Sequence, residues 1–289
     1  MFRKIPEKLD LALLIDRINF FIFNFALWTL SMCENDKLIS EHKPTPWGFW
    51  ATMGFSCVIG SVYFLIQVIV VALFFLAAMI RVPEFNIDKF CSGLQADGLF
   101  LATATCVAAP FIIVLMVIFA KIRVSITVKE YLCLRRVGWK ELFKWSLIVL
   151  LLAGTFDTLT FLLDRPIVTK FMVDTYTTAY FVPFLWFAFI IVAPLTEELF
   201  FRGFLFKGIE HSRIGAAGAV VITSLLWSVM HIQYDIYGIT NLFISGLLLG
   251  LARVKSNSIY PPVAMHILQN IIATVETIIY LRMAANAVY

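Results

Sequence analysis

Charged residues are scarce in this chain of 289 residues: Asp, Glu, Lys and Arg together make up only 15% of it. A soluble globular protein carries about 25% charged and roughly 45–50% apolar residues, whereas here the hydrophobic share is 61%. This composition excludes a water-soluble domain, a disordered chain and a free-standing nucleic-acid binder. The net charge of +4 is too small to indicate polyanionic partners. The composition therefore predicts a polytopic membrane protein.

Paired cysteines are also lacking. The chain has five cysteines, an odd number, and no CxxC spacing. Cys57 and Cys106 lie inside apolar runs, where cysteine behaves as a small hydrophobic residue. A disulfide framework and a thiolate metal site are therefore not indicated. Internal repeats and low-complexity linkers are absent from the sequence as well, so we expect a single membrane domain.

Long apolar runs define the predicted architecture, because a membrane-spanning helix needs about 20 mostly apolar residues. We predict an all-α bundle of about seven spans: 48–80, 98–120, 145–163, 179–206, 216–232, 239–252 and 259–280. Residues 10–32 form a further apolar stretch that Asp16 and Arg17 interrupt. We predict an interfacial amphipathic helix there, with an eighth span as the alternative. Residues 1–47 are thus expected to form a cytoplasmic or interfacial segment, and residues 48–289 the transmembrane bundle.

The orientation follows from the distribution of Lys and Arg, which favour cytoplasmic loops. From the N-terminus onward, the successive connecting segments carry six, two, seven, two, three, none, two and one of these residues, if Arg202 near the end of the fourth span is counted with Lys207 and Arg213. This alternation predicts a cytoplasmic N-terminus and an outer C-terminus. An eighth span would instead place Lys37 and Lys43 outside, in one loop with three acids. The short loops favour a bacterial inner membrane.

Ionisable residues inside apolar spans are functional-site hypotheses by default. The predicted spans contain Asp157, Glu197, Glu198, Arg202, His231 and His266. Glu198 and Arg202 are four residues apart and can form a helical ion pair. Glu197 lies about 100° around the helix from Glu198 and has no such partner. A carboxyl group shielded from water holds its proton more tightly, which suits a general base.

The later spans add two further pairs at helical spacing. Trp227 and His231 share one helix face, and His266 and Asn270 share another. The second pair can donate hydrogen bonds to a developing oxyanion, or hold a water or a metal. The alternative for both pairs is hydrogen bonding between helices. For Asp157, which is flanked by threonines, we expect a structural role.

Three of the late predicted spans carry one motif each, in this order: Glu197-Glu198-Leu199-Phe200-Phe201-Arg202, Trp227-Ser228-Val229-Met230-His231 and His266-Ile267-Leu268-Gln269-Asn270. Over residues 178–275 the chain resembles the CPBP intramembrane proteases, also called the ABI or type II CAAX prenyl endopeptidase family. The second motif of that family usually begins with phenylalanine, where this chain has tryptophan. We expect that difference to affect the shape of the cavity, and hence substrate choice, more than the chemistry.

The resemblance implies an intramembrane endopeptidase that acts on a membrane-embedded or lipidated protein. Glu197 would activate a water, His231 would position it, and His266 with Asn270 would stabilise the oxyanion. Glu198, Arg202 and Trp227 would support the site. Glu197, His231 and His266 are also candidate ligands for a divalent metal such as zinc. Because Glu197 cannot easily be both ligand and base, we favour glutamate-activated water with an optional metal.

Two other functions stay open. The family also includes members associated with bacteriocin immunity, so a non-catalytic immunity factor or membrane scaffold is the main alternative. A proton-coupled transporter would show discontinuous helices and related halves, and the halves of this sequence are unrelated.

The depth of the site residues gives a further test. At 1.5 Å per residue, Glu197 lies about 15 Å from Lys207, and His266 lies about 16 Å from Lys255. Both distances reach the middle of a ~30 Å hydrocarbon core. His231 lies about 27 Å from Arg213 by the same count. It fits only if residues 215–218 lie flat at the interface.

Overall fold

The computed structural model describes residues 45–81 and 85–286, which all belong to one compact unit, Pro44–Tyr289. All regular secondary structure in these two ranges is helical. The interfacial helix predicted at residues 10–32 lies outside the described residues, as does most of the predicted N-terminal segment.

Six stretches of helix are long and apolar enough to cross a membrane, which confirms the predicted helical bundle. They are α2 (Phe49–Arg81), α4 (Gly98–Ile122), α6 (Trp139–Leu162), the composite stretch Val182–Glu210, α12 (Ile236–Ser256) and α13 (Tyr260–Asn286). Three shorter helices lie in segments predicted as loops: α3 (Ile87–Leu94), α5 (Val128–Tyr131) and α7 (Lys170–Thr178). Asn86, Thr127 and Thr169 cap their first turns.

The fifth predicted span is shorter than expected. It is the helix α11 (Gly215–Val229), whose 15 residues extend about 22 Å, less than the ~30 Å hydrocarbon core. Residues 215–218, which the prediction placed flat at the interface, form the first turn of α11. The chain soon turns back because the Asp235 carboxylate accepts the Gly238 N–H at 2.9 Å and starts α12. His231, which the prediction placed inside this span, consequently lies in the connection between α11 and α12, beyond the end of the helix.

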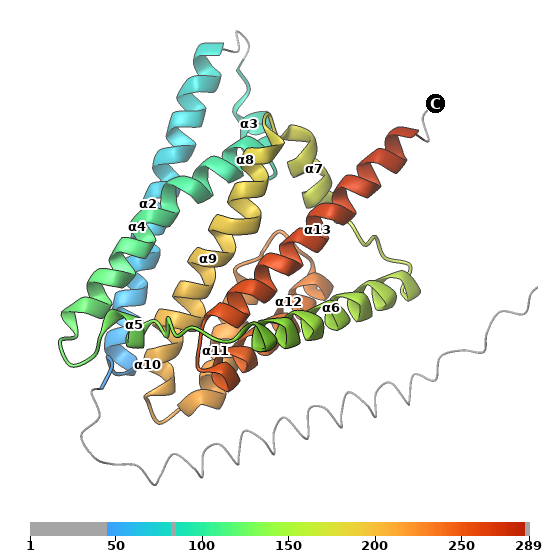
Figure 1. Cartoon of the computed structure of the whole chain (residues 1–289). Helices are drawn as coiled ribbons and strands as arrows, with labels where there is room; N and C mark the ends of the chain where they lie inside the picture. Colours follow the sequence, from blue (N-terminus) through green and yellow to red (C-terminus); the bar gives the residue numbers. More distant parts are fainter. Residues whose placement is uncertain (1–44, 82–84, 287–289) are drawn as a thin grey trace, which may run out of the picture. The chain divides into compact units, whose positions relative to one another are not determined.

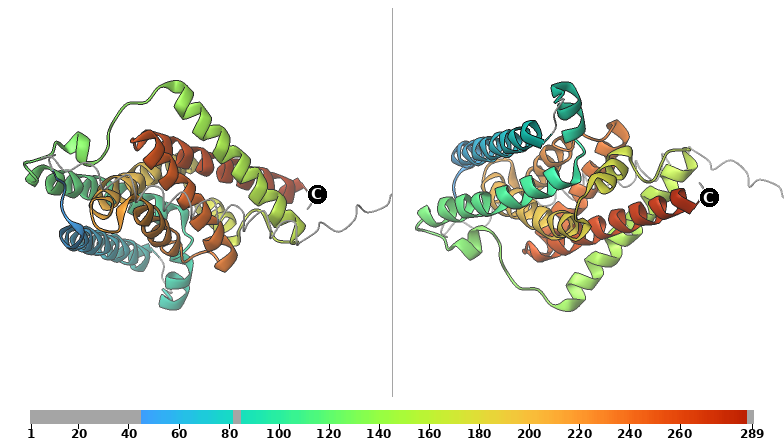
Figure 2. Two further views of the ribbon diagram at one scale, coloured as in Figure 1. Left: turned by 90° about the horizontal axis from the view of Figure 1, so that it is seen from below. Right: turned by 90° about the horizontal axis from the view of Figure 1, so that it is seen from above.

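Two pairs of long helices flank the composite helix (Figures 1 and 2). α2 packs beside α4 on one side, and α6 packs beside α13 on the other. Most side chains of α2 are exposed, including Phe64, Leu65 and Leu73. In a polytopic protein such a surface faces lipid, so the site has to be built from the remaining helices.

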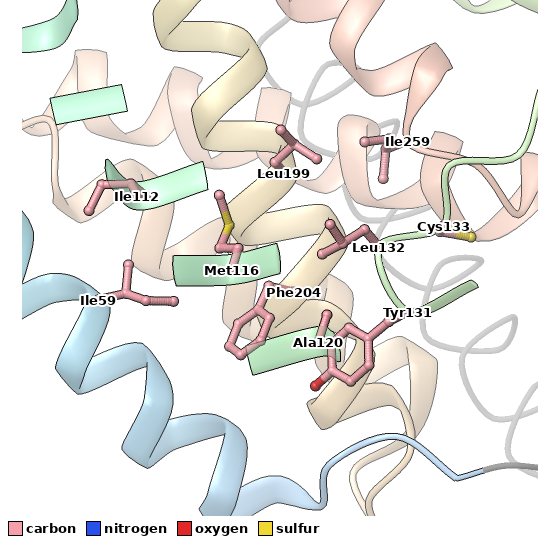
Figure 3. Packing of buried hydrophobic residues seen from close by; sticks show 10 residues of the cluster. All are labelled: Ile59, Ile112, Met116, Ala120, Tyr131, Leu132, Cys133, Leu199, Phe204 and Ile259. Carbon is pink, nitrogen blue, oxygen red and sulfur yellow. The ribbon is translucent and has the colours of Figure 1, made fainter. Parts of the chain in front are cut away.

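A buried apolar cluster fixes the part of the composite helix that follows Glu198 (Figure 3). Ile59 of α2, Met116 of α4 and Leu132 next to α5 meet Leu199 and Phe204 of the composite helix there. Phe204 stacks on Tyr131, with ring centroids 5.5 Å apart. This packing sets the position of the helical turns that follow Glu198.

α11 and α12 approach closely through small residues. A Cβ placed on Gly246 would lie 2.9 Å from the Cβ of Ser224, and one on Gly250 would lie 3.0 Å from Val220. Small residues four apart allow helix backbones to come together in membranes. The approach brings the Gly246 carbonyl and Trp227 to the same buried region, next to the composite helix.

Candidate active site

The composite helix presents two neighbouring glutamates from a short α-helical piece between two π-helical turns. It runs as α8 (Val182–Trp186), η2 (Phe187–Val192), α9 (Ala193–Glu198), η3 (Leu199–Leu205) and α10 (Phe206–Glu210). π-Helical turns are rare and occur frequently at functional sites. Glu197 and Glu198 end α9, directly before the second wide turn. The two carboxylates leave the helix in different directions, as the sequence predicted.

Glu198 lies in a dry ion-pair network. Its Oε1 accepts Arg202 Nη1 at 2.8 Å, and both side chains are fully buried, which confirms the predicted pair. The same oxygen lies 2.9 Å from Nδ1 of His266. Arg202 also donates to the Gly246 carbonyl at 3.3 Å, in the region where α11 and α12 meet. Buried charges need this kind of compensation, because burying them unpaired is costly.

Trp227 contacts Glu197, Arg202 and both histidines. Its Nε1–H donates to Glu197 Oε2 at 2.6 Å. The indole ring lies edge-on to His231 and His266, with centroid distances of 5.0 and 5.2 Å. The Arg202 guanidinium lies 5.0 Å from its centre. Because all four residues contact one buried indole, α9, α11 and α13 bring an acid and two imidazoles to one place.

The two imidazoles are oriented in the same way. His231 Nδ1 lies 2.8 Å from the Trp227 carbonyl oxygen, which can only accept, so Nδ1 carries the proton of this bond. His266 Nδ1 faces the Glu198 carboxylate in the same manner. In both rings Nε2 is the nitrogen left for chemistry. A neutral imidazole held this way accepts a proton at Nε2, as in triads where a carboxylate orients a histidine.

Asn270 is anchored to the first π-helical turn. Its Nδ2 donates to the Phe189 carbonyl at 2.7 Å, which occupies one of its two amide hydrogens. The expected pair of oxyanion donors therefore needs refinement. His266 has already given its Nδ1–H to Glu198, so it can donate only through a protonated Nε2. Asn270 has one hydrogen left to donate.

These residues line one cavity of about 640 Å³. Its walls include Glu197, Trp227, His231, His266 and Asn270, together with parts of α6, α7 and α12. At the rim, Arg165 pairs with Asp235 at 2.6 Å. Hydrogen bonds from the Gly238 amide and from Arg165 hold the pKa of Asp235 below its usual range. Tyr234 lies beside them, and burial raises its pKa to about 12, so its hydroxyl stays protonated.

The sequence reasoning missed Glu276 and undervalued Asp157. Both line the cavity, and their two carboxyl groups interact with each other. Glu276 lies inside the last predicted span, so its depth alone should have marked it as a candidate. Asp157 is on α6, and no spacing in the sequence relates it to α13. Only the packing of these two helices reveals the pair.

The donor set does not fit a bound metal. The described residues contain no group of three His, Cys, Asp or Glu side chains close enough to hold an ion. Glu197 Oε2 is engaged by Trp227, and each Nδ1 has its own partner. The candidate zinc ligands Glu197, His231 and His266 are therefore neighbours around one indole, and their arrangement is not that of a ligand set.

Comparison with known proteins agrees with the motifs. Residues 179–272, about a third of the chain, match the family described as "Type II CAAX prenyl endopeptidase Rce1-like". This confirms the resemblance to the CPBP family that the three motifs indicated. An uncharacterized 24.3 kDa protein of Escherichia coli is 37% identical over 83 residues, which cover 26% of this chain and 36% of that protein. No solved structure matches. Together with its six apolar helices, the family match identifies the chain as an integral membrane protein.

Proposed function

We propose that the chain is an intramembrane endopeptidase that hydrolyses a peptide bond through water activated by Glu197. The contrast between the two glutamates carries this proposal. Glu198 is neutralised by Arg202, whereas Glu197 lines a cavity next to both imidazoles and, among the described residues, accepts a hydrogen bond from the indole N–H alone. The family match is consistent with peptidase chemistry in this part of the chain.

In this mechanism Glu197 takes a proton from a water in the cavity as the water oxygen attacks the peptide carbonyl. His231 and His266 orient that water through Nε2. The remaining amide hydrogen of Asn270 stabilises the oxyanion that forms. When the C–N bond breaks, protonated Glu197 gives its proton to the leaving amine, which regenerates the carboxylate.

The proposed substrate is a membrane-embedded or lipidated protein segment. The cavity lies among apolar helices and combines aromatic side chains with many polar and charged ones, so it can accept both a segment of substrate and the water that attacks it. We propose a location in a bacterial inner membrane with the N-terminus in the cytoplasm, following the distribution of Lys and Arg.

The test is quantitative membrane proteomics in the native host, comparing wild type, a Glu197→Gln strain and a Glu210→Gln strain. Glu210 is in the same composite helix but pairs with Lys207 at 3.3 Å, away from the cavity. We expect uncleaved precursors to accumulate only in the Glu197→Gln strain.

Complementation separates the alternatives. If Glu197→Gln restores a deletion phenotype as fully as wild type does, the chain acts as a scaffold or immunity factor and the peptidase proposal fails. Solute uptake by proteoliposomes containing the wild-type protein would favour a transporter instead.

A further inference from the structure

A second concave site lies at the other end of α6, apart from the proposed active site. It has a volume of about 720 Å³ and is formed by the segment before α6, the first turns of α6 and the end of α12. Its charged lining consists of four basic residues and one acid: Arg135, Arg136, Lys144, Lys255 and Glu141. None of these residues belongs to the motifs that define the proposed active site.

Two of the four basic side chains of this pocket, Arg135 and Arg136, are not compensated by any acid in the part of the chain that the structure describes. Glu141 is already engaged, because it accepts Lys144 at 2.7 Å and the Trp145 indole N–H at 2.7 Å. The side chains of Arg135 and Arg136 make no ion pair or hydrogen bond with any residue in 45–81 or 85–286. Two guanidinium groups thus face an open pocket. Guanidinium is the side-chain group best suited to bidentate binding of phosphate.

The backbone adds to the positive electrostatic potential of the pocket. Gly138 lines the pocket and is the N-cap residue of α6, a helix of 24 residues, and it provides no side-chain cap. The first amides of such a helix point outward and favour an anion.

The surroundings indicate where the anion comes from. Residues 121–144 carry seven Lys and Arg residues and are predicted to be cytoplasmic, at the surface where anionic lipids attract basic segments. On the side of α6 that carries Lys144, three and seven residues further along the helix, Leu147 and Leu151 are exposed. A phosphate group in the pocket would therefore have apolar side chains beside it, where acyl chains can lie.

We propose that this pocket binds the phosphate of an anionic phospholipid headgroup in the cytoplasmic leaflet. Arg135 and Arg136 hold the phosphate, Lys144 and Lys255 line its rim, and the acyl chains lie along the exposed face of α6. Basic pockets between transmembrane helices on the cytoplasmic side are suited to such headgroups. This inference does not depend on the proposed peptidase activity.

The test is native mass spectrometry of the full-length protein in neutral detergent, titrated with phosphatidylglycerol or phosphatidylcholine. We expect the wild type to prefer phosphatidylglycerol. Arg135→Gln with Arg136→Gln should weaken that binding about thirtyfold and remove most of the preference over phosphatidylcholine. The double Lys variant, Arg135→Lys with Arg136→Lys, keeps the charge and should retain most of the binding.

The matched control is Lys121→Gln with Lys129→Gln, which removes the same charge from the same basic segment outside the pocket. Its phosphatidylglycerol binding should equal that of wild type. The proposal is overturned if this control loses as much binding as the arginine variant, or if the wild type does not distinguish the two lipids. Full displacement of phosphatidylglycerol by excess inorganic phosphate would identify a soluble phosphate as the ligand and reject the lipid.

Discussion

Glu197 and Glu198 are neighbours in the chain, but they lie in two different environments. Glu198 is completely buried, ion-paired with Arg202 and linked to His266. Glu197 is only partly buried, lines the cavity and accepts one hydrogen bond from a neutral indole. The buried carboxylate of Glu198 therefore stabilises the packing of the helices, whereas the carboxylate of Glu197, which lines the cavity, is available for chemistry.

The difference shows how one helix can supply both rigidity and reactivity. The buried network around Glu198 fixes Arg202 against Gly246 and holds His266 by its Nδ1. Glu197 lines the cavity and forms no ion pair within residues 45–81 and 85–286, so its carboxylate is available to a water there. If this interpretation is correct, identical substitutions at the two positions should have opposite signatures.

Glu197→Gln should produce the largest effect on activity. It preserves shape and keeps an oxygen acceptor for Trp227, but it removes the proposed general base. We expect cleavage to fall by about 10²–10⁴-fold, with thermal unfolding in detergent close to that of wild type. Cleavage of an accumulated precursor by purified protein measures the loss. Retained turnover would reject Glu197 as the base.

Glu198→Gln should reduce stability more than it directly affects the chemistry. Removing the charge leaves Arg202 buried without its counter-ion, which costs about 3–5 kcal/mol. We therefore expect a clear loss of folded protein, measured by unfolding in detergent. A Glu198→Leu and Arg202→Met double variant should recover part of this stability, since no lone charge remains. Unchanged stability of the single variant would mean that the buried network around Glu198 does not stabilise the fold.

Trp227→Phe tests how the indole connects the buried network of Glu198 with the cavity that Glu197 lines. Phenylalanine keeps the ring between the histidines but cannot donate to Glu197, and hydrogen bonds to charged groups contribute about 1.5–3 kcal/mol. We expect activity to fall about tenfold or more, mainly in kcat, with little change in stability. Trp186→Phe, in α8 and away from Glu197, is the control and should keep full activity. Wild-type kcat in Trp227→Phe would show that the indole N–H is dispensable.

The smallest effect is expected at the rim. The folded-state pKa of Asp235 is depressed, so its stabilising contribution is present above its unfolded pKa and is lost as the pH falls through the folded value. Asp235→Asn keeps a good helix cap and removes only the charge. Melting temperatures of wild type and variant should differ slightly at neutral pH and converge in acid. A constant difference down to low pH would contradict this assignment.

Most of the membrane architecture could be predicted from the sequence, because long apolar runs have few alternatives in a bilayer. The predicted spans at 48–80 and 98–120 agree closely with α2 and α4. The prediction was wrong for the fifth span, since hydropathy continues past Val229 whereas the helix does not. The turn depends on Asp235 capping the next helix, a local hydrogen bond that an apolar pattern does not reveal.

The candidate site could be predicted in part. Spacing of four residues was enough to pair Glu198 with Arg202 and to place Trp227 beside His231. The indole hydrogen bond to Glu197, the bond from His266 to Glu198 and the meeting of Asp157 with Glu276 all join different helices. Such contacts depend on helix rotation and crossing, which periodicity within one segment does not define.

The sequence by itself determined that this chain is a bundle of membrane helices with acids and imidazoles in or next to its apolar segments, because apolar composition and helical spacing are local properties. Only the tertiary structure decided that Glu197 faces the cavity and that His266 joins the ion pair of Glu198. It also decided which ring nitrogens are left for chemistry. These outcomes depend on how separate helices pack around Trp227, and packing is a property of the whole fold.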